Sequence, residues 1–135
     1  MQIFVQIHPN PGKELPQSFE ELAERLGEMP GMYFEMDGSF VWVDHASVPP
    51  GQMDGMVYDR NGRLEYVEIK GACNARQWII LCSAVCGQDH GKFAKGTELD
   101  YSEFDCKQMD RVARVHRADE GNWTTIGEIA SQLAI

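Results

Sequence analysis

The sequence lacks the features of a membrane protein or an exported protein. No segment reaches the roughly 18 uninterrupted apolar residues that a transmembrane helix requires. Residues 1–10 contain neither a basic region nor a small-residue cleavage site, so we predict no signal peptide. We therefore expect a cytoplasmic protein that has no membrane partner.

Basic residues are also scarce. The chain has 12 Lys and Arg residues against 21 Asp and Glu residues, which gives a net charge of −9. Residues 1–70 hold 5 of the basic and 12 of the acidic residues, or −7 of that charge. This acidity disfavours nucleic acid as a partner of the whole surface and leaves it only as a partner of a local basic strip.

Cysteine is limited to four residues, and no export signal favours disulfides between them, so we expect reduced thiols. Cys82, Cys86 and His90 follow one another at intervals of four, and Cys73 lies nearby. Structural zinc sites usually combine a close Cys-x-x-Cys pair with a distant second pair, which is missing here. The sequence therefore favours buried thiols over a zinc site.

Motifs for nucleotide binding and for covalent catalysis are missing from the sequence. It contains no Walker loop, no GxGxxG motif and no GxSxG elbow. A cysteine nucleophile would require Cys73 or Cys106 to lie beside a histidine, and no local signature supports such a pair with His45, His90 or His116.

The 135 residues, 43% of them hydrophobic, suffice for one domain, which we place at residues 1–135. Residues 2–7 predict a strand. Ser18 stands three residues before Glu21, the spacing of a capping box, and predicts the start of a helix. A second helix, apolar nearly all round, is predicted over residues 74–86 with Asn74 as its N-cap.

Two β-hairpins are predicted between these helices, each with a turn rich in Asp, Asn and Gly. The hairpins pair residues 32–36 with 40–44, around Asp37-Gly38-Ser39, and residues 52–58 with 63–70, around Arg60-Asn61-Gly62. The middle of the second hairpin is apolar on both faces, which predicts cover above and below it. The fold class expected is α/β or α+β, with a mixed sheet of four to five strands and a central β-hairpin flanked by helices.

The turn of the second hairpin decides which side chains share a face. A two-residue Asn-Gly turn places Asp54 opposite Ile69 and leaves Asp54 and Glu68 on opposite faces. A three-residue turn, with Gly62 in the left-handed conformation, pairs Asp54 with Glu68 and puts Lys70 on the same face. Two facing carboxylates form a site for Mg²⁺ or Mn²⁺, since hard cations prefer oxygen ligands.

The pattern Asp54-x13-Glu68-x-Lys70 resembles the core motif of the PD-(D/E)XK nuclease superfamily, and the resemblance covers about residues 18–86. Met53 stands where the Pro of the motif's name would be. The resemblance implies metal-dependent hydrolysis of phosphodiesters. In that mechanism Asp54 and Glu68 hold Mg²⁺ or Mn²⁺, and Lys70 assists the attack of water.

The same resemblance implies two further site residues, each from a helix. The helix before the sheet often supplies a carboxylate in this superfamily, and Glu20 or Glu24 matches that place. A glutamine in the helix after the hairpin recurs in some branches, and Gln77 matches it.

The residues themselves also allow a non-catalytic interpretation. Asp54 can cap a turn while Glu68 and Lys70 belong to a solvated strand edge, so that the protein is an α+β interaction or binding module without enzymatic activity. No pattern in the sequence indicates an oligomeric state.

Two patterns remain in the C-terminal third. Basic residues recur every three or four positions over residues 107–117, which predicts a helix with a basic stripe made of Lys107, Arg111, Arg114 and Arg117. Such a stripe can contact phosphate, but pairing with neighbouring acids is the favoured interpretation. Residues 123–135 are similar to the opening helix of a helix-turn-helix. The recognition helix is missing, so we expect a packing helix at 125–133.

Overall fold

The computed structural model describes residues 2–48, 50–88 and 106–134. His90, the one histidine of the Cys82, Cys86 and His90 pattern, lies outside the described residues. Within them the chain forms seven strands and four helices. In chain order they are β1 Gln2–Pro9, α1 Phe19–Gly27, β2 Met32–Phe34, β3 Ser39–Asp44, β4 Gly51–Arg60, β5 Arg63–Ala72, α2 Ala75–Val85, α3 Cys106–Val112, β6 Ala113–Arg117, β7 Asn122–Thr124 and α4 Ile126–Gln132.

The strands form a single sheet in the order β2-β3-β4-β5-β1-β6-β7. All six neighbouring pairs are antiparallel. The α/β class and the central hairpin, β4–β5, are confirmed. The expected mixed sheet of four to five strands is wrong, because β6 and β7 extend the sheet beyond β1 and every pair of neighbouring strands is antiparallel.

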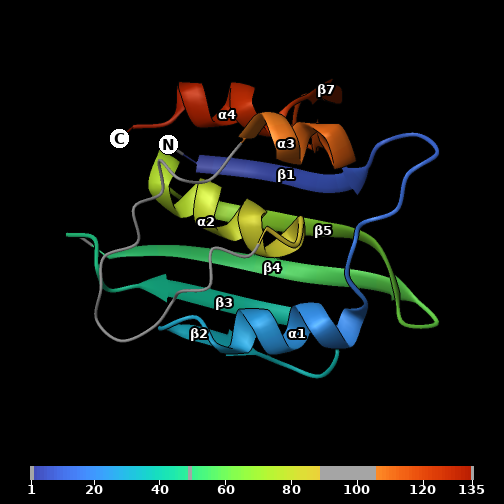
Figure 1. Ribbon diagram of the computed structural model, residues 1–135. Helices are drawn as coiled ribbons and strands as arrows, with labels where there is room; N and C mark the ends of the chain where they lie inside the picture. Colours follow the sequence, from blue (N-terminus) through green and yellow to red (C-terminus); the bar gives the residue numbers. More distant parts are fainter. Residues whose placement is uncertain (1, 49, 89–105, 135) are drawn as a thin grey trace.

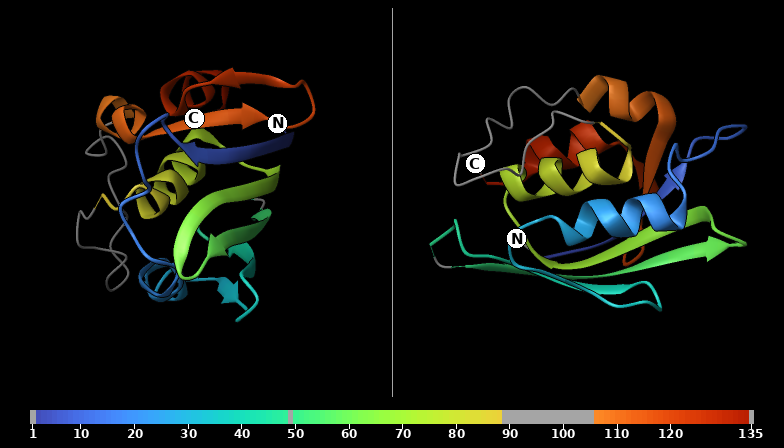
Figure 2. Two further views of the ribbon diagram at one scale, coloured as in Figure 1. Left: turned by 90° about the vertical axis from the view of Figure 1, so that its right-hand side faces the viewer. Right: turned by 60° about the horizontal axis from the view of Figure 1, so that its bottom comes forward.

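The four helices lie on one side of this sheet, as Figures 1 and 2 show. Every strand longer than three residues buries alternate side chains toward the helices and leaves the others at least partly exposed. The predicted cover above and below the hairpin is therefore wrong. The apolar side chains of its second face are Met56, Tyr58 and Tyr66, and they remain partly accessible to solvent.

Both predicted helix starts are confirmed. The Ser18 hydroxyl accepts a hydrogen bond from the backbone N–H of Glu21, whose carboxylate accepts one from the N–H of Ser18. Asn74 and Gln77 form the same reciprocal pair at the start of α2. Each box satisfies two N–H groups that a helix N-terminus leaves without intrahelical partners.

The helix α2 is the centre of the core, and α4 packs against it. The Trp78 side chain is fully buried, and its indole N–H donates to the backbone carbonyl of Ile126 at 3.0 Å. The carboxylate of Asp110 accepts the N–H groups of Ile126 and Gly127. The chain after β7 thus ends in a packing helix, as expected. None of the helices in the described ranges is long and apolar enough to cross a membrane.

The β4–β5 hairpin combines features of both predicted turns. Asn61 and Gly62 have φ values of 54° and 83°, which are typical of a two-residue type I′ turn. The register then shifts by one between Tyr58 and Asp59, because Glu65 bulges out without a partner on β4. Beyond this bulge, Asp54 lies opposite Lys70, and Glu68 lies opposite Met56.

The helix predicted over residues 107–117 is half wrong. The helix α3 ends at Val112, and residues 113–117 form β6, which pairs with β1. Ala113 and Val115 face the core, whereas Arg114 alternates to the other face of the sheet. The expected basic stripe along one helix is therefore divided between a helix and a strand.

A methyl group at Gly55 is expected to destabilise the sheet. An ideal Cβ at Gly55 lies 2.0 Å from Cζ of Phe40, whose buried ring covers this glycine. We expect Gly55→Ala to lower the free energy of unfolding by about 2 kcal/mol, measured by urea denaturation. The matched control is Gly27→Ala in α1, where, beyond the neighbouring helix backbone, no described atom lies within 4 Å of an ideal Cβ. It is expected to raise stability by about 0.5 kcal/mol. Equal effects of the two substitutions would contradict the packing account.

Candidate functional site

The side of the sheet that faces away from the helices is the candidate site, and we call it the open face. Its residues follow from the strand registers and share partial or full exposure. They are Phe4, Gln6, His8, Tyr33, Ser39, Val41, Val43, Gln52, Asp54, Met56, Tyr58, Tyr66, Glu68, Lys70, Arg114, His116 and Trp123. Among these residues the charges of Asp54 and Glu68 balance those of Lys70 and Arg114, whereas the whole chain carries −9.

Five rings form a continuous row across one end of the open face. We call this set, from β4, β5, β1, β6 and β7, the aromatic row: Tyr58, Tyr66, His8, His116 and Trp123. Tyr66 stacks on Tyr58 with ring centroids 4.4 Å apart and on His8 at 4.7 Å. Trp123 contacts His8 at 5.2 Å and His116 at 4.9 Å. These cross-strand contacts stabilise the register of five strands.

Arg114 lies against the outer end of this row. Its guanidinium carbon is 3.7 Å from the centroid of the Trp123 ring, a cation–π contact. Other arginines of the described ranges, Arg60, Arg63, Arg76 and Arg117, lie within 4.0 Å of a carboxylate. Among the residues that the structure describes, Arg114 has no such ion pair, and its buried Nε has no hydrogen-bond acceptor.

His8 connects the row to the acidic part of the open face. The amide nitrogen of Gln6 donates to the Glu68 carboxylate at 3.1 Å, and Nε2 of His8 lies 3.0 Å from the amide oxygen of Gln6. Because that oxygen only accepts, Nε2 of His8 carries the hydrogen. Burial lowers the pKa of His8 below its ordinary value of 6.5, and the positive charges of His116 and Arg114 lower it further.

Asp54, Glu68 and Lys70, the residues of the predicted nuclease site, share the open face. The two carboxylates, however, have separate hydrogen-bond partners. Glu68 is drawn toward β1 by Gln6. Asp54, on β4, lies 3.4 Å from the amide nitrogen of Gln52. The Lys70 ammonium is 5.3 Å from the centroid of the Phe4 ring. Among the described residues, no three His, Cys, Asp or Glu side chains gather into a metal-ligand group.

The further residues that the nuclease resemblance implied lie on the other side of the sheet. Glu20 and Glu24 belong to α1, within the helix layer (Figure 2). Gln77 is buried in α2 and serves the helix cap and a polar cluster there. The sheet itself separates these three side chains from Asp54, so the structure does not bring the implied constellation together.

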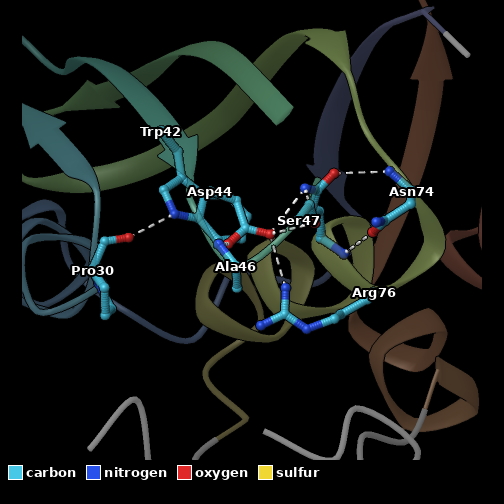
Figure 3. Close-up of polar contacts among 8 residues, drawn as sticks. Pro30, Trp42, Asp44, Ala46, Ser47, Asn74 and Arg76 are labelled. Carbon is cyan, nitrogen blue, oxygen red and sulfur yellow. Dashed lines mark hydrogen bonds and ion pairs between the residues drawn. The ribbon is translucent and has the colours of Figure 1, made fainter. Parts of the chain in front are cut away.

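The polar cluster around Gln77 is drawn in Figure 3. Its centre is the carboxylate of Asp44, which is only 5% exposed. That carboxylate accepts hydrogen bonds from Arg76 at 2.8 Å, from the Gln77 amide at 2.9 Å and from the Ser47 hydroxyl at 3.1 Å. It also accepts the backbone N–H of Ala46. Because every group in it has a partner, the cluster fastens the β3–β4 loop to the start of α2.

The electrostatics of Asp44 agree with this structural role. Burial alone raises the pKa of its carboxyl, but the hydrogen bonds and the positive charge of Arg76 outweigh burial. The pKa of Asp44 in the folded protein therefore lies below its ordinary value of 3.8.

The four cysteines are free, and three of them are buried. Burial raises the pKa of Cys73 and of Cys86 to about 12 and raises that of Cys82 well above its ordinary value. These thiols stay protonated at neutral pH and cannot act as nucleophiles. The expectation that Cys82 and Cys86 are buried small side chains is confirmed.

Sequence reasoning missed the aromatic row. Its signal was the alternation of large side chains in β4 and β5, where Tyr58 and Tyr66 belong to the apolar middle of the hairpin that was expected to be covered on both faces. Trp123 begins the segment that is similar to the opening helix of a helix-turn-helix, but it lies in β7, before the helix. The row is complete only when β6 and β7 extend the sheet past β1.

Comparisons of the chain with protein-family models, with curated proteins and with solved structures found no match.

Proposed function

We propose that this protein is a non-catalytic binding domain and that the open face binds a protein partner. The observation that carries this proposal is the aromatic row on a sheet face that the four helices leave uncovered. Tyr, Trp and Arg are the residues most enriched at the energetic centres of protein interfaces, since each combines a large apolar surface with a polar group. Trp123, 46% exposed, and Tyr33, 64% exposed, offer such surface on the open face.

Charge supports a protein partner. Asp54 and Glu68 balance Lys70 and Arg114, so a partner with mixed charges meets no net repulsion on the open face. A long polyanion would extend past these four residues to the rest of the surface. It would be repelled there, because the chain as a whole carries −9.

The stacking of the rings also favours protein over nucleic acid. Proteins that bind single strands present free ring faces on which bases stack. The interplanar angle is 22° between Tyr58 and Tyr66 and 15° between Tyr66 and His8, so these rings cover one another's faces. Both tyrosines remain partly exposed, and the edges of such rings suit contacts with protein side chains.

Site-specific photo-crosslinking tests this proposal. A photoreactive phenylalanine analogue replaces Tyr33 on the open face in one variant and the exposed Glu24 of α1 in a second, matched variant. In a lysate of the cells that make the protein, we expect the Tyr33 variant to form a crosslink to a protein that mass spectrometry then identifies. Its binding is confirmed with purified components. Crosslinks from position 24 but not from position 33 would contradict the proposal.

The second candidate function is metal-dependent hydrolysis of phosphodiesters. The observation that favours it is that Asp54, Glu68 and Lys70 share the open face. Asp54 and Glu68 would hold Mg²⁺ or Mn²⁺, for which Glu68 must exchange its hydrogen bond from Gln6 for the metal. Lys70 would position the attacking water and stabilise charge on the phosphate.

Calorimetric titration with Mn²⁺ tests this second candidate. It predicts that the wild type binds Mn²⁺ and that Asp54→Ala loses about tenfold or more in affinity. The carboxylate variant Glu24→Ala, in the helix layer, is the control and is expected to bind like the wild type. Equal binding by the wild type and Asp54→Ala would eliminate this site.

A further inference from the structure

Arg114 is an arginine that the fold leaves available for a ligand. Its guanidinium stacks on Trp123, and its buried Nε has no acceptor. Within the ranges described, no carboxylate lies within ion-pair distance of it, although the chain has nearly twice as many acids as bases. Stacking holds a guanidinium plane in place, so little entropy is lost when its free N–H groups bind an anion.

The groups around Arg114 do not neutralise its positive charge. His8 lies opposite Arg114 in the β1–β6 register, and His116 follows two residues later on the same face. The remaining groups that face His8 are Gln6 on its own strand, Tyr66 and Glu68 from β5, and Trp123 from β7. Glu68, the one acid among them, is reached only through Gln6. An oxyanion beside Arg114 would meet the charge of the guanidinium and the N–H groups of the two imidazole rings.

We infer that Arg114, flanked by His8 and His116, is an oxyanion-binding site on the open face that receives a carboxylate from the protein partner. The inference rests on the function proposed above and specifies the partner's chemistry. A carboxylate matches the planar fork of arginine with two parallel hydrogen bonds. It also carries a single charge, whereas phosphate brings up to two charges to a face that already carries Glu68 and Asp54.

Nuclear magnetic resonance of the histidine ring protons tests the site on the isolated protein. The probes are acetate, inorganic phosphate and a single-stranded oligothymidylate, compared with chloride at equal ionic strength. We expect acetate to bind weakly, with a Kd on the order of 10 mM, and to raise the pKa of His8. Its affinity is expected to increase as the pH falls from about 8 to about 5.5, because protonated imidazole attracts the anion.

Two variants on one strand isolate the role of Arg114. Arg114→Gln is expected to weaken acetate binding about tenfold. The same variant raises the pKa of His8 in chloride, because a neighbouring positive charge is removed, and this shift shows that the ring is still in place. Arg117→Gln is the matched control. The Arg117 side chain points away from the open face. It donates a hydrogen bond to Gln132 and pairs with Glu120, so acetate binding is expected to be unchanged.

Should Arg114→Gln fail to fold, Arg114→Lys keeps the charge and the apolar stem but not the fork, and about a threefold loss is expected. The inference is overturned if acetate acts no more strongly than chloride, or if phosphate or the oligothymidylate binds this site more tightly than acetate. Those results would leave a crosslink from position 33 intact, so the failure of this inference and that of the proposed function are distinguishable.

Discussion

Replacing Asp44 with alanine is expected to lower the free energy of unfolding by about 3 kcal/mol. The substitution removes the acceptor for Arg76, for the Gln77 amide and for the Ser47 hydroxyl, and these donors lie in a largely buried cluster. An unpaired buried donor costs the desolvation energy that its hydrogen bond had offset. Urea denaturation followed by circular dichroism measures the effect.

The pH dependence of the same substitution provides an internal check. The pKa of Asp44 is lowered by folding, so its contribution is complete above its ordinary value of 3.8 and is lost as the pH falls through the folded-state pKa. The stability difference between the wild type and Asp44→Asn is therefore expected to shrink below about pH 4. At neutral pH, Asp44→Asn keeps an acceptor oxygen and is expected to cost about half as much as alanine. A difference that grows in acid would contradict this account.

Replacing Trp123 with serine is expected to weaken binding of the crosslinked partner about thirtyfold, or about 2 kcal/mol. The indole contacts His8 and His116 and supports the guanidinium of Arg114, so its loss disturbs the outer half of the aromatic row. The free energy of unfolding is expected to change by less than about 1 kcal/mol, because Trp123 is 46% exposed on an edge strand. Isothermal titration calorimetry and urea denaturation measure the two effects separately.

The control for this experiment is Met36→Ser. Met36 is 95% exposed but lies outside the strands of the open face. The substitution Met36→Ser removes exposed apolar surface but leaves the aromatic row intact. The affinity for the partner is therefore expected to stay within about twofold of the wild type. If both variants weakened binding equally, the row would have no special place in the interface.

Local chemistry explains which parts of the fold could be predicted. Ser18 and Asn74 begin helices because each can accept N–H groups that the helix itself leaves without partners. Asn61-Gly62 predicts a hairpin because both residues tolerate positive φ. The segment 113–117 was mistaken for helix because its arginines recur at helical spacing, while only Ala113 and Val115 mark the alternation of a strand.

The candidate site depended on features that a sequence does not display. The bulge at Glu65 restores Asp54 and Glu68 to one face after a two-residue turn, but it places Lys70, not Glu68, opposite Asp54. The uncovered side of the sheet could not be predicted either, since its partly exposed tyrosines resemble core residues in a hydrophobicity pattern. The prediction that Asp54 and Glu68 bind metal stays a prediction.

Hydroxyl-radical footprinting of the protein, free and bound to its crosslinked partner, tests the central claim most directly. It reports the solvent access of individual side chains and therefore separates the two sides of the molecule. If the open face is the binding surface, Trp123, Tyr66 and Tyr33 are expected to lose most of their oxidation in the complex. Met36 is expected to be oxidised at the same rate as in the free protein. Protection confined to exposed residues of the helix layer, with Trp123 and Tyr33 oxidised as fast as in the free protein, would contradict it.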